Sequence, residues 1–294
     1  MQELKNKSPL TVSIVLPAKN EAQNIGALLL KIQALKLDAE LLLINDGSSD
    51  ETADIAYKLG AKVITHPYSL GNGAAVKTGA RNATGHILIF MDADGQHNPD
   101  DIPILLNKLN AGYDMVVGAR HPSTHSSLVR RFGNWIYNGM ASYMTQHKIE
   151  DLTSGFRAVR ADKFRKFLYL LPNGFSYPTT STMAFFRSGF HVGYVPIHAG
   201  TRKGQSHIHI LKDGYRFFIV ILRVGALFSP MRFFLPISVW MFLSGLGNYG
   251  YTFFTQGRFT NMSMLLLLSS LFVFLMGIIS EQISSLHYKY IEEK

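Results

Sequence analysis

A cluster of oxygen-bearing side chains follows an apolar run near the middle of the chain. Ile89-Phe90-Met91 leads directly into Asp92-Ala93-Asp94-Gly95-Gln96, which supplies two carboxylates and an amide. Such ligands suit a hard divalent cation, which keeps some of its waters and takes further ligands from substrate phosphates. An ordinary turn is the weaker interpretation of Asp-Ala-Asp-Gly. The pattern therefore predicts a metal site.

Two further polar turns occur earlier in the chain, each directly after an apolar run. They are Pro17-Ala18-Lys19-Asn20-Glu21 and Asn45-Asp46-Gly47-Ser48-Ser49-Asp50. Asp and Ser in such turns also cap helices. Two polar turns at adjacent strand ends, however, offer carboxylates for ribose hydroxyls and base edges, which favours a nucleotide site.

These turns lie in a region whose pattern is typical of a parallel α/β sheet. Apolar runs of five to seven residues alternate with helical periodicity between residues 11 and 118. We expect strands at 11–16, 40–44, 61–65, 86–91 and 113–117, with helices near 21–36, 50–59, 72–83 and 99–110. Ligands of such sheets bind outside the carboxyl ends of the strands, which is where the polar turns fall.

The segment from 120 to 210 continues the same domain, with helices expected at 127–147, 161–170 and around 178–188 and a strand near 191–197. Gly71 to Thr78 resembles a phosphate-binding P-loop, but Val76 occupies a position where that motif needs glycine. Gly71, Gly79 and Gly85 are better explained by close packing and tight turns.

The C-terminal part of the chain is strongly apolar. Residues 233–257 and 261–280 contain no charge, and each stretch exceeds the about 20 residues that span a bilayer. In the preceding segment Lys212, Arg216 and Arg223 fall within about 40° of one another on a helix that is otherwise apolar, which favours an interfacial helix. Six cations between Arg202 and Arg232 precede the first span, so the large domain is expected in the cytoplasm.

Composition limits the remaining options. The 294 residues carry a net charge of +9 and no cysteine, which excludes disulfides and Cys-based zinc sites. The clearest basic cluster lies beside the apolar spans, so anionic lipid and phosphate explain the charge better than nucleic acid does. A tethered nucleotide-binding scaffold without catalysis stays open, although it has no use for the cluster at Asp92.

Six motifs of this chain occur in the order and spacing of family 2 glycosyltransferases. More closely, the chain resembles the polyprenyl-phosphate (dolichyl-phosphate) mannose and glucose synthases, including bacterial members with two C-terminal membrane helices. The resemblance covers nearly the whole chain and rests on the two early turns, Gly71-Asn72-Gly73 with Ala83-Thr84-Gly85, the acidic turn at Asp92, Gly118-Ala119-Arg120, and Asp151-Leu152-Thr153-Ser154-Gly155-Phe156-Arg157.

The resemblance implies a GT-A fold (Rossmann-like, with a mainly parallel sheet) and inverting transfer of a hexose from a nucleotide sugar to a polyprenyl phosphate. Mg²⁺ or Mn²⁺ would assist, with Asp94 and Gln96 as the nearest ligands. Asp151 matches the proposed catalytic carboxylate. The acceptor phosphate or the sugar would contact Arg120, Ser154 and Arg157, and the nucleotide sugar would contact Pro17, Asn20, Glu21, Asp46, Asp92, Arg202 and Ser206.

The loop that contains Arg202 and Ser206 departs from the family pattern, because many members have Lys where this chain has His207. Donors of the GDP-mannose and UDP-glucose types both stay open, as do a different acceptor and a homo-oligomer formed through the membrane helices. We expect a GT-A domain over 1–208, an interfacial helix over 209–230 and an anchor over 231–294, with transmembrane helices at about 233–256 and 262–284. The enzyme would then be a multi-pass protein of the inner (plasma) membrane.

Overall fold

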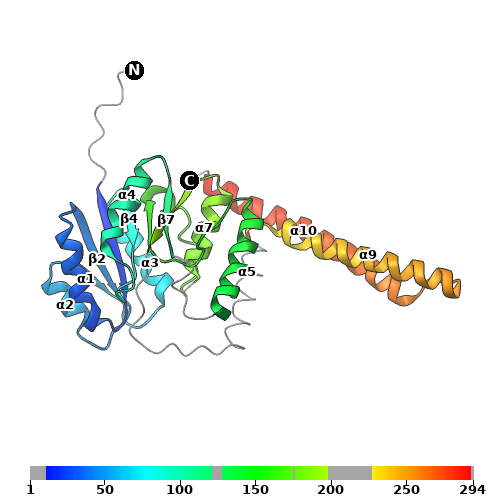
Figure 1. Ribbon diagram of the computed structural model, residues 1–294, viewed down its shortest axis with the longest axis horizontal. Helices are drawn as coiled ribbons and strands as arrows, with labels where there is room; N and C mark the ends of the chain where they lie inside the picture. The colour runs from blue at the N-terminus through cyan, green and yellow to red at the C-terminus, as the bar shows by residue number, and fades with distance from the viewer. Residues whose placement is uncertain (1–10, 121–127, 175, 198–226, 293–294) are drawn as a thin grey trace, which may run out of the picture. The chain divides into compact units, whose positions relative to one another are not determined.

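The computed structural model describes residues 11–120, 128–174, 176–197 and 227–292, as Figure 1 shows. These residues group into two compact units. The first contains the described residues 11–120, 128–142, 147–174 and 176–197, and the second contains residues 143–146 and 227–292.

A single mixed sheet forms the centre of the first unit. Among the described residues its seven strands are β1 (Val12–Ala18), β2 (Ala39–Asn45), β3 (Lys62–Thr65), β4 (Ile87–Phe90), β5 (Met115–Arg120), β6 (Arg157–Arg160) and β7 (Val192–Ile197). They are arranged in the order β3-β2-β1-β4-β6-β5-β7. All neighbours pair in parallel except β6, which is antiparallel to both β4 and β5. The predicted strands are confirmed, and β6 was not predicted.

Helices cover both faces of this sheet. One face packs against α1 (Ala22–Ala34), α2 (Thr52–Lys58) and α4 (Ile102–Asn110), which follows the short η1 (Pro99–Asp101); the other packs against α3 (Asn72–Asn82), α6 (Ala161–Arg165) and α7 (Tyr177–Arg187). On the second face the ring of Phe90 lies 4.8 Å from that of Phe164. On the first face Ile14 and Leu43 belong to one buried cluster with Leu29. The result is the doubly wound α/β architecture expected from the sequence.

Two glycines, Gly79 within helix α3 and Gly71 directly before it, lie too close to neighbouring parts of the chain to carry a side chain. A Cβ atom at Gly79 would lie 2.2 Å from Val15 Cγ1, and one at Gly71, where φ is 101°, would lie 2.5 Å from the Asn173 carbonyl oxygen. That carbonyl also accepts a hydrogen bond from Ala74 N–H (3.1 Å), so residue 173 occupies the helix N-terminus. The interpretation of these glycines as packing residues rather than a P-loop is confirmed.

In the second unit α9 (Pro230–Gln256) and α10 (Asn261–Glu292) run side by side as a hairpin (Figure 1). Between residues 231 and 286 the buried positions recur every seven residues and carry only small side chains: Ser238, Gly245 and Thr252 in α9, and Ser263, Ser270, Gly277 and Ser284 in α10. Large apolar side chains point outward instead, and Trp240 and Phe254 are 69% and 88% exposed.

Among the described residues, Asn261–Leu286 of α10 is the one helical segment that is long and apolar enough to cross a membrane. The two predicted spans fall within α9 and α10. The predicted interfacial helix over 209–230 lies outside the described residues up to position 226.

Two helical glycines allow a direct test of the close packing. Gly79→Ala should lower the free energy of unfolding by about 1–3 kcal/mol, because its methyl group overlaps Val15. Gly139→Ala, in the exposed part of α5 (Leu128–Thr145) with nothing within 4 Å, should be neutral or should stabilise the protein by up to about 1 kcal/mol through helix propensity. Thermal unfolding of the detergent-solubilised full chain measures both, and equal effects would contradict the packing interpretation.

Candidate active site

The turns that follow β1 and β2 are joined by hydrogen bonds at the carboxyl edge of the sheet. The Asn20 side-chain oxygen accepts from Ser49 N–H (2.8 Å), and Glu21 N–H donates to the Thr52 hydroxyl (2.8 Å). Asn20 is exposed and has a φ of 56°, whereas Pro17 is buried within β1. The expectation that these two polar turns lie at adjacent strand ends is confirmed.

The Asp46 carboxylate is buried and is surrounded by donors from the segment that follows β3. Its Oδ1 lies 2.8 Å from both His66 Nδ1 and Leu70 N, and its Oδ2 accepts from the Ser69 hydroxyl (2.8 Å) and Gly71 N–H (2.9 Å). Burial alone would raise the pKa of Asp46, but these hydrogen bonds hold the pKa below its ordinary value. Asp46 therefore fixes the conformation of the segment from His66 to Gly71.

The acidic turn after β4 has carboxylates suited to a metal. Asp92 and Asp94 are half-buried, and neither forms an ion pair with a described residue. Asp94 Oδ1 accepts from Gln96 N–H (3.1 Å), and a Cβ atom at Gly155 would lie 2.8 Å from Asp92 Oδ2. The described residues contain no group of three His, Cys, Asp or Glu side chains that could hold a metal alone. Two carboxylates and an amide fit a cation that shares its other ligands with water and substrate.

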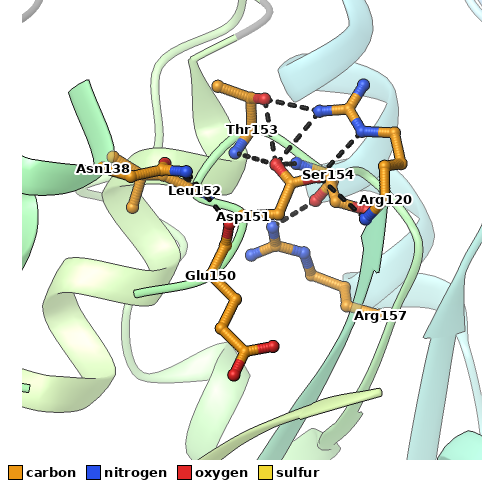
Figure 2. A network of polar contacts seen from close by, with 8 residues as sticks. All are labelled: Arg120, Asn138, Glu150, Asp151, Leu152, Thr153, Ser154 and Arg157. Carbon is orange, nitrogen blue, oxygen red and sulfur yellow. Dashed lines mark hydrogen bonds and ion pairs between the residues drawn. The ribbon is translucent and has the colours of Figure 1, made fainter. Parts of the chain in front are cut away.

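Arg120 and Asp151 form a bidentate ion pair, shown in Figure 2. Arg120, the last residue of β5, donates from Nε to Asp151 Oδ2 (2.8 Å) and from Nη2 to Oδ1 (3.0 Å). Asp151 also accepts from the N–H groups of Thr153 (3.0 Å) and Ser154 (3.1 Å). Burial alone would raise the pKa of Asp151, but the hydrogen bonds and charge of Arg120 hold the pKa below its ordinary value. Asp151 is thus a carboxylate at neutral pH.

Arg157, at the start of β6, is completely buried. Its Nη1 donates to the Pro178 carbonyl (3.0 Å) and to the hydroxyls of Ser181 (2.7 Å) and Thr182 (3.2 Å), and its Nη2 donates to the Ser154 carbonyl. None of these partners is a carboxylate. Burial lowers the pKa of Arg157, because the cation has lost its solvation. An uncompensated buried cation of this kind favours a nearby anion.

Five buried side-chain atoms of the described residues lack a hydrogen-bond partner, and all belong to the region around Asp92 and Asp151. Asn72 contacts Asp92 (3.5 Å), Ser154 is bonded to Asp151 through its N–H, and the other side chains interact electrostatically with Asp92 or Asp151. Buried polar atoms are nearly always paired in folded proteins. Their concentration near Asp92 and Asp151 makes this part of the first unit the candidate site for a polar ligand. The atoms are Asn72 Oδ1, His97 Nδ1, Ser154 Oγ, Arg157 Nε and Tyr194 OH.

Three of the residues in this region were not singled out from the sequence. His97 directly follows Gln96, and its ring stacks on Phe156 at 5.1 Å. The other two, Tyr177 and Tyr194, come from α7 and β7, and burial raises the pKa of both hydroxyls. For His97 the signal was its place in the acidic turn, whereas no local pattern distinguishes the tyrosines. Of the predicted residues, Arg202 and Ser206 lie outside the described part of the chain, as does His207.

The lowered pKa of Asp151 predicts a pH dependence of stability. Its ionised form contributes stability above about pH 4, the pKa of an unfolded aspartate, and this contribution is lost as the pH falls toward the lower pKa of the folded state. Asp151→Asn should cost about 2–4 kcal/mol at pH 7 and should make the decline between pH 5 and 3 shallower. Chemical denaturation at several pH values measures this. Asp54→Asn, an exposed change on α2, is the control, and a wild-type slope in Asp151→Asn would refute the assignment.

Comparisons with known proteins identify the family of this chain. The profile of the family described as glycosyl transferase family 2 matches residues 13–168, and that of the GtrB C-terminal hairpin matches residues 229–286. The chain is 33% identical over 159 residues to undecaprenyl-phosphate 4-deoxy-4-formamido-L-arabinose transferase of Photorhabdus laumondii, which covers 51% of this chain and 49% of that protein. It is 28% identical over 205 residues to dolichyl-phosphate hexose transferase of Haloferax volcanii, covering 69% and 89%.

Among solved structures, glucosyl-3-phosphoglycerate synthase from Mycobacterium tuberculosis, in complex with Mn²⁺, UDP and glucosyl-3-phosphoglycerate, superposes with a TM-score of 0.59 at 19% identity. The match covers 73% of this chain and 78% of that one, and it shows the shared fold. With more than half of the chain matched by the family profile, the protein belongs to glycosyltransferase family 2 and is a glycosyltransferase with a GT-A, Rossmann-like, mostly parallel sheet.

Proposed function

We propose that this glycosyltransferase moves a sugar, with inversion, from a nucleotide sugar of the GDP-mannose or UDP-glucose type to the phosphate of a polyprenyl phosphate. One observation carries the proposal: the acidic turn at Asp92 packs against Gly155, in the turn that links Asp151, the partner of Arg120, to the buried Arg157. Metal-binding carboxylates beside phosphate-binding cations suit a reaction between two phosphate-bearing substrates. Relatives named for undecaprenyl-phosphate and dolichyl-phosphate support this acceptor class.

On the donor side, the turns after β1 and β2 would hold the nucleoside and the turn after β4 would hold the diphosphate. A bound Mg²⁺ or Mn²⁺ offsets negative charge on the departing nucleoside diphosphate. Asp94 and Gln96 would bind this ion, and Asp92 would support both the ion and the donor. The remaining direct donor contacts would come from Pro17, Asn20, Glu21, Arg202 and Ser206. Asp46, whose carboxylate already accepts four hydrogen bonds, would act on the donor through the segment that it holds.

On the acceptor side, Arg120, Ser154 and Arg157 would face the lipid phosphate or the sugar. A phosphate monoester has a second pKa of about 6, so the acceptor is mostly deprotonated at neutral pH. The reaction then hardly needs Asp151 as a general base. Its ion pair with Arg120 (2.8 Å) supports a role in orienting the acceptor instead. In this role Asp151 is the catalytic carboxylate.

The hairpin would anchor the enzyme as two transmembrane helices. Its packing is inverted relative to a water-soluble protein, because the small residues are inside and the large apolar residues are outside. The 27 residues of α9 extend about 40 Å, which exceeds the about 30 Å of a bilayer core. We therefore propose a GT-A domain over 1–208, an interfacial helix over 209–230 and a multi-pass anchor over 231–294 in the plasma membrane, with the domain on the cytoplasmic face.

The proposed reaction is tested with purified protein, Mg²⁺ or Mn²⁺, undecaprenyl phosphate and a panel of UDP- and GDP-sugars, following lipid-linked product. Asp94→Ala should abolish product formation and metal-dependent donor binding while leaving the thermal unfolding midpoint unchanged, because the side chain lies outside the core. Asp100→Ala, an exposed acid six residues later in η1, is the control. Turnover by Asp94→Ala that still requires metal would refute the metal assignment, and donor binding without product would favour a scaffold.

The proposed topology can be tested with single cysteines, because the chain has none. In right-side-out vesicles a membrane-impermeant maleimide should label Arg258→Cys, in the loop between α9 and α10. Asp54→Cys, on α2, should be labelled only after lysis. Leu243→Cys lies at the middle of α9 and is 60% exposed on the hairpin. It should stay unlabelled in intact and in lysed vesicles until the protein is denatured. Labelling of Leu243→Cys in membranes would exclude α9 as a span.

A further inference from the structure

His66 connects the carboxylate of Asp46 to a helix on the second face of the sheet. Its Nδ1 lies 2.8 Å from Asp46 Oδ1, and its Nε2 lies 2.9 Å from the Thr78 hydroxyl on α3. The side chain of His66 is buried, with 8% of its surface exposed. With Nδ1 carrying the proton that faces the carboxylate, Nε2 accepts from Thr78. Both ring nitrogens are therefore used within the protein.

The four bonds to Asp46 leave its carboxylate no unused acceptor direction, because a carboxylate has about four lone-pair sites. Its effect on a ligand must then pass through the chain that it holds. That chain is the segment 69–71, whose N–H groups at positions 70 and 71 point to the carboxylate. A Cβ atom at Gly47 would lie 2.8 Å from Ser69 N, so the segment also packs directly on the turn after β2.

Helix α3 reaches the other half of the donor site as well. Its first residue, Asn72, lies 3.5 Å from Asp92 Oδ1 through Nδ2, and Thr78 lies in the same helix. The His66 contacts thus connect the turn proposed for the nucleoside to the helix that contacts the turn proposed for the diphosphate. The distance between these two turns must match the length of a nucleoside diphosphate.

We propose that the hydrogen-bonded series Thr78–His66–Asp46, named here the His66 bridge, is a positioning device that sets donor affinity. The inference rests on the proposed function, because it assumes that the turns after β2 and β4 hold the nucleotide sugar. The bridge contacts neither substrate. It holds the 69–71 segment and α3 at the separation that the donor requires.

Thr78 offers a mild test, because valine keeps its shape and removes only the hydroxyl. Thr78→Val should raise the donor KM about 3–10-fold, the range expected for one hydrogen bond, with kcat and the acceptor KM unchanged. Thr78→Ser should restore the wild-type donor KM. Calorimetric titration of UDP and GDP in the presence of Mn²⁺ should show the same loss and the same rescue without any acceptor.

A matched control comes from the opposite edge of the sheet. The Thr84 hydroxyl donates to Glu40 Oε2 (3.0 Å), so Thr84→Val also removes one side-chain hydrogen bond. This variant should leave nucleotide affinity unchanged. Unchanged affinity in Thr78→Val, or an equal loss in Thr84→Val, would overturn the inference. If nucleotide binding behaves as expected while no lipid-linked product forms with wild type, the bridge stands and the proposed acceptor falls.

Discussion

The ion pair between Arg120 and Asp151 is the contact on which the proposed acceptor half of the site depends. It joins the last residue of β5 to a turn 31 residues later in the chain. The same carboxylate accepts hydrogen bonds from the N–H groups of Thr153 and Ser154, which fixes the backbone of the turn. The carbonyl of Ser154 then accepts from Arg157. One bidentate pair therefore positions two cations at a single edge of the sheet.

The reversed direction of β6 explains why Arg157 lies there. In the sheet register Arg157 is opposite Phe90 of β4 and Val117 of β5, near the carboxyl ends of these two strands. A parallel β6 would have placed its first residue at the other edge. Because β6 is antiparallel, the turn that leads into it joins the polar turns of β1, β2 and β4. The fold thereby gathers carboxylates and arginines from distant parts of the chain.

Small residues bring neighbouring elements close together in both units, for different reasons. In the first unit Gly79 lets α3 lie against Val15, which places the helix near Asp46 and Asp92. In the hairpin, small residues at seven-residue intervals let α9 and α10 pack while their large side chains face outward. Gly245 and Gly277 lie against Leu267 and Phe234 at 3.0 Å from an added Cβ. In water an outward apolar surface is costly, whereas in lipid it is the favourable arrangement.

The sequence by itself determined the elements and the local turns, because both are encoded over a few residues. Apolar runs located the strands β1 to β5, and the acidic turn after β4 was visible as Asp92-Ala93-Asp94. The apolar C-terminal segments likewise predicted two long helices. These features depend on side-chain periodicity and turn chemistry, which short windows of sequence contain.

Only the tertiary structure decided which side chains meet. The strand β6 has four residues and no distinctive pattern, so its pairing with β4 and β5 comes from the sheet around it. The hydrogen bonds of Arg157 with α7, and those that Asp46 accepts from its four donors, connect residues 20 to 25 positions apart. Such contacts form when packing offsets the entropy of ordering the intervening chain, and no local pattern records that balance.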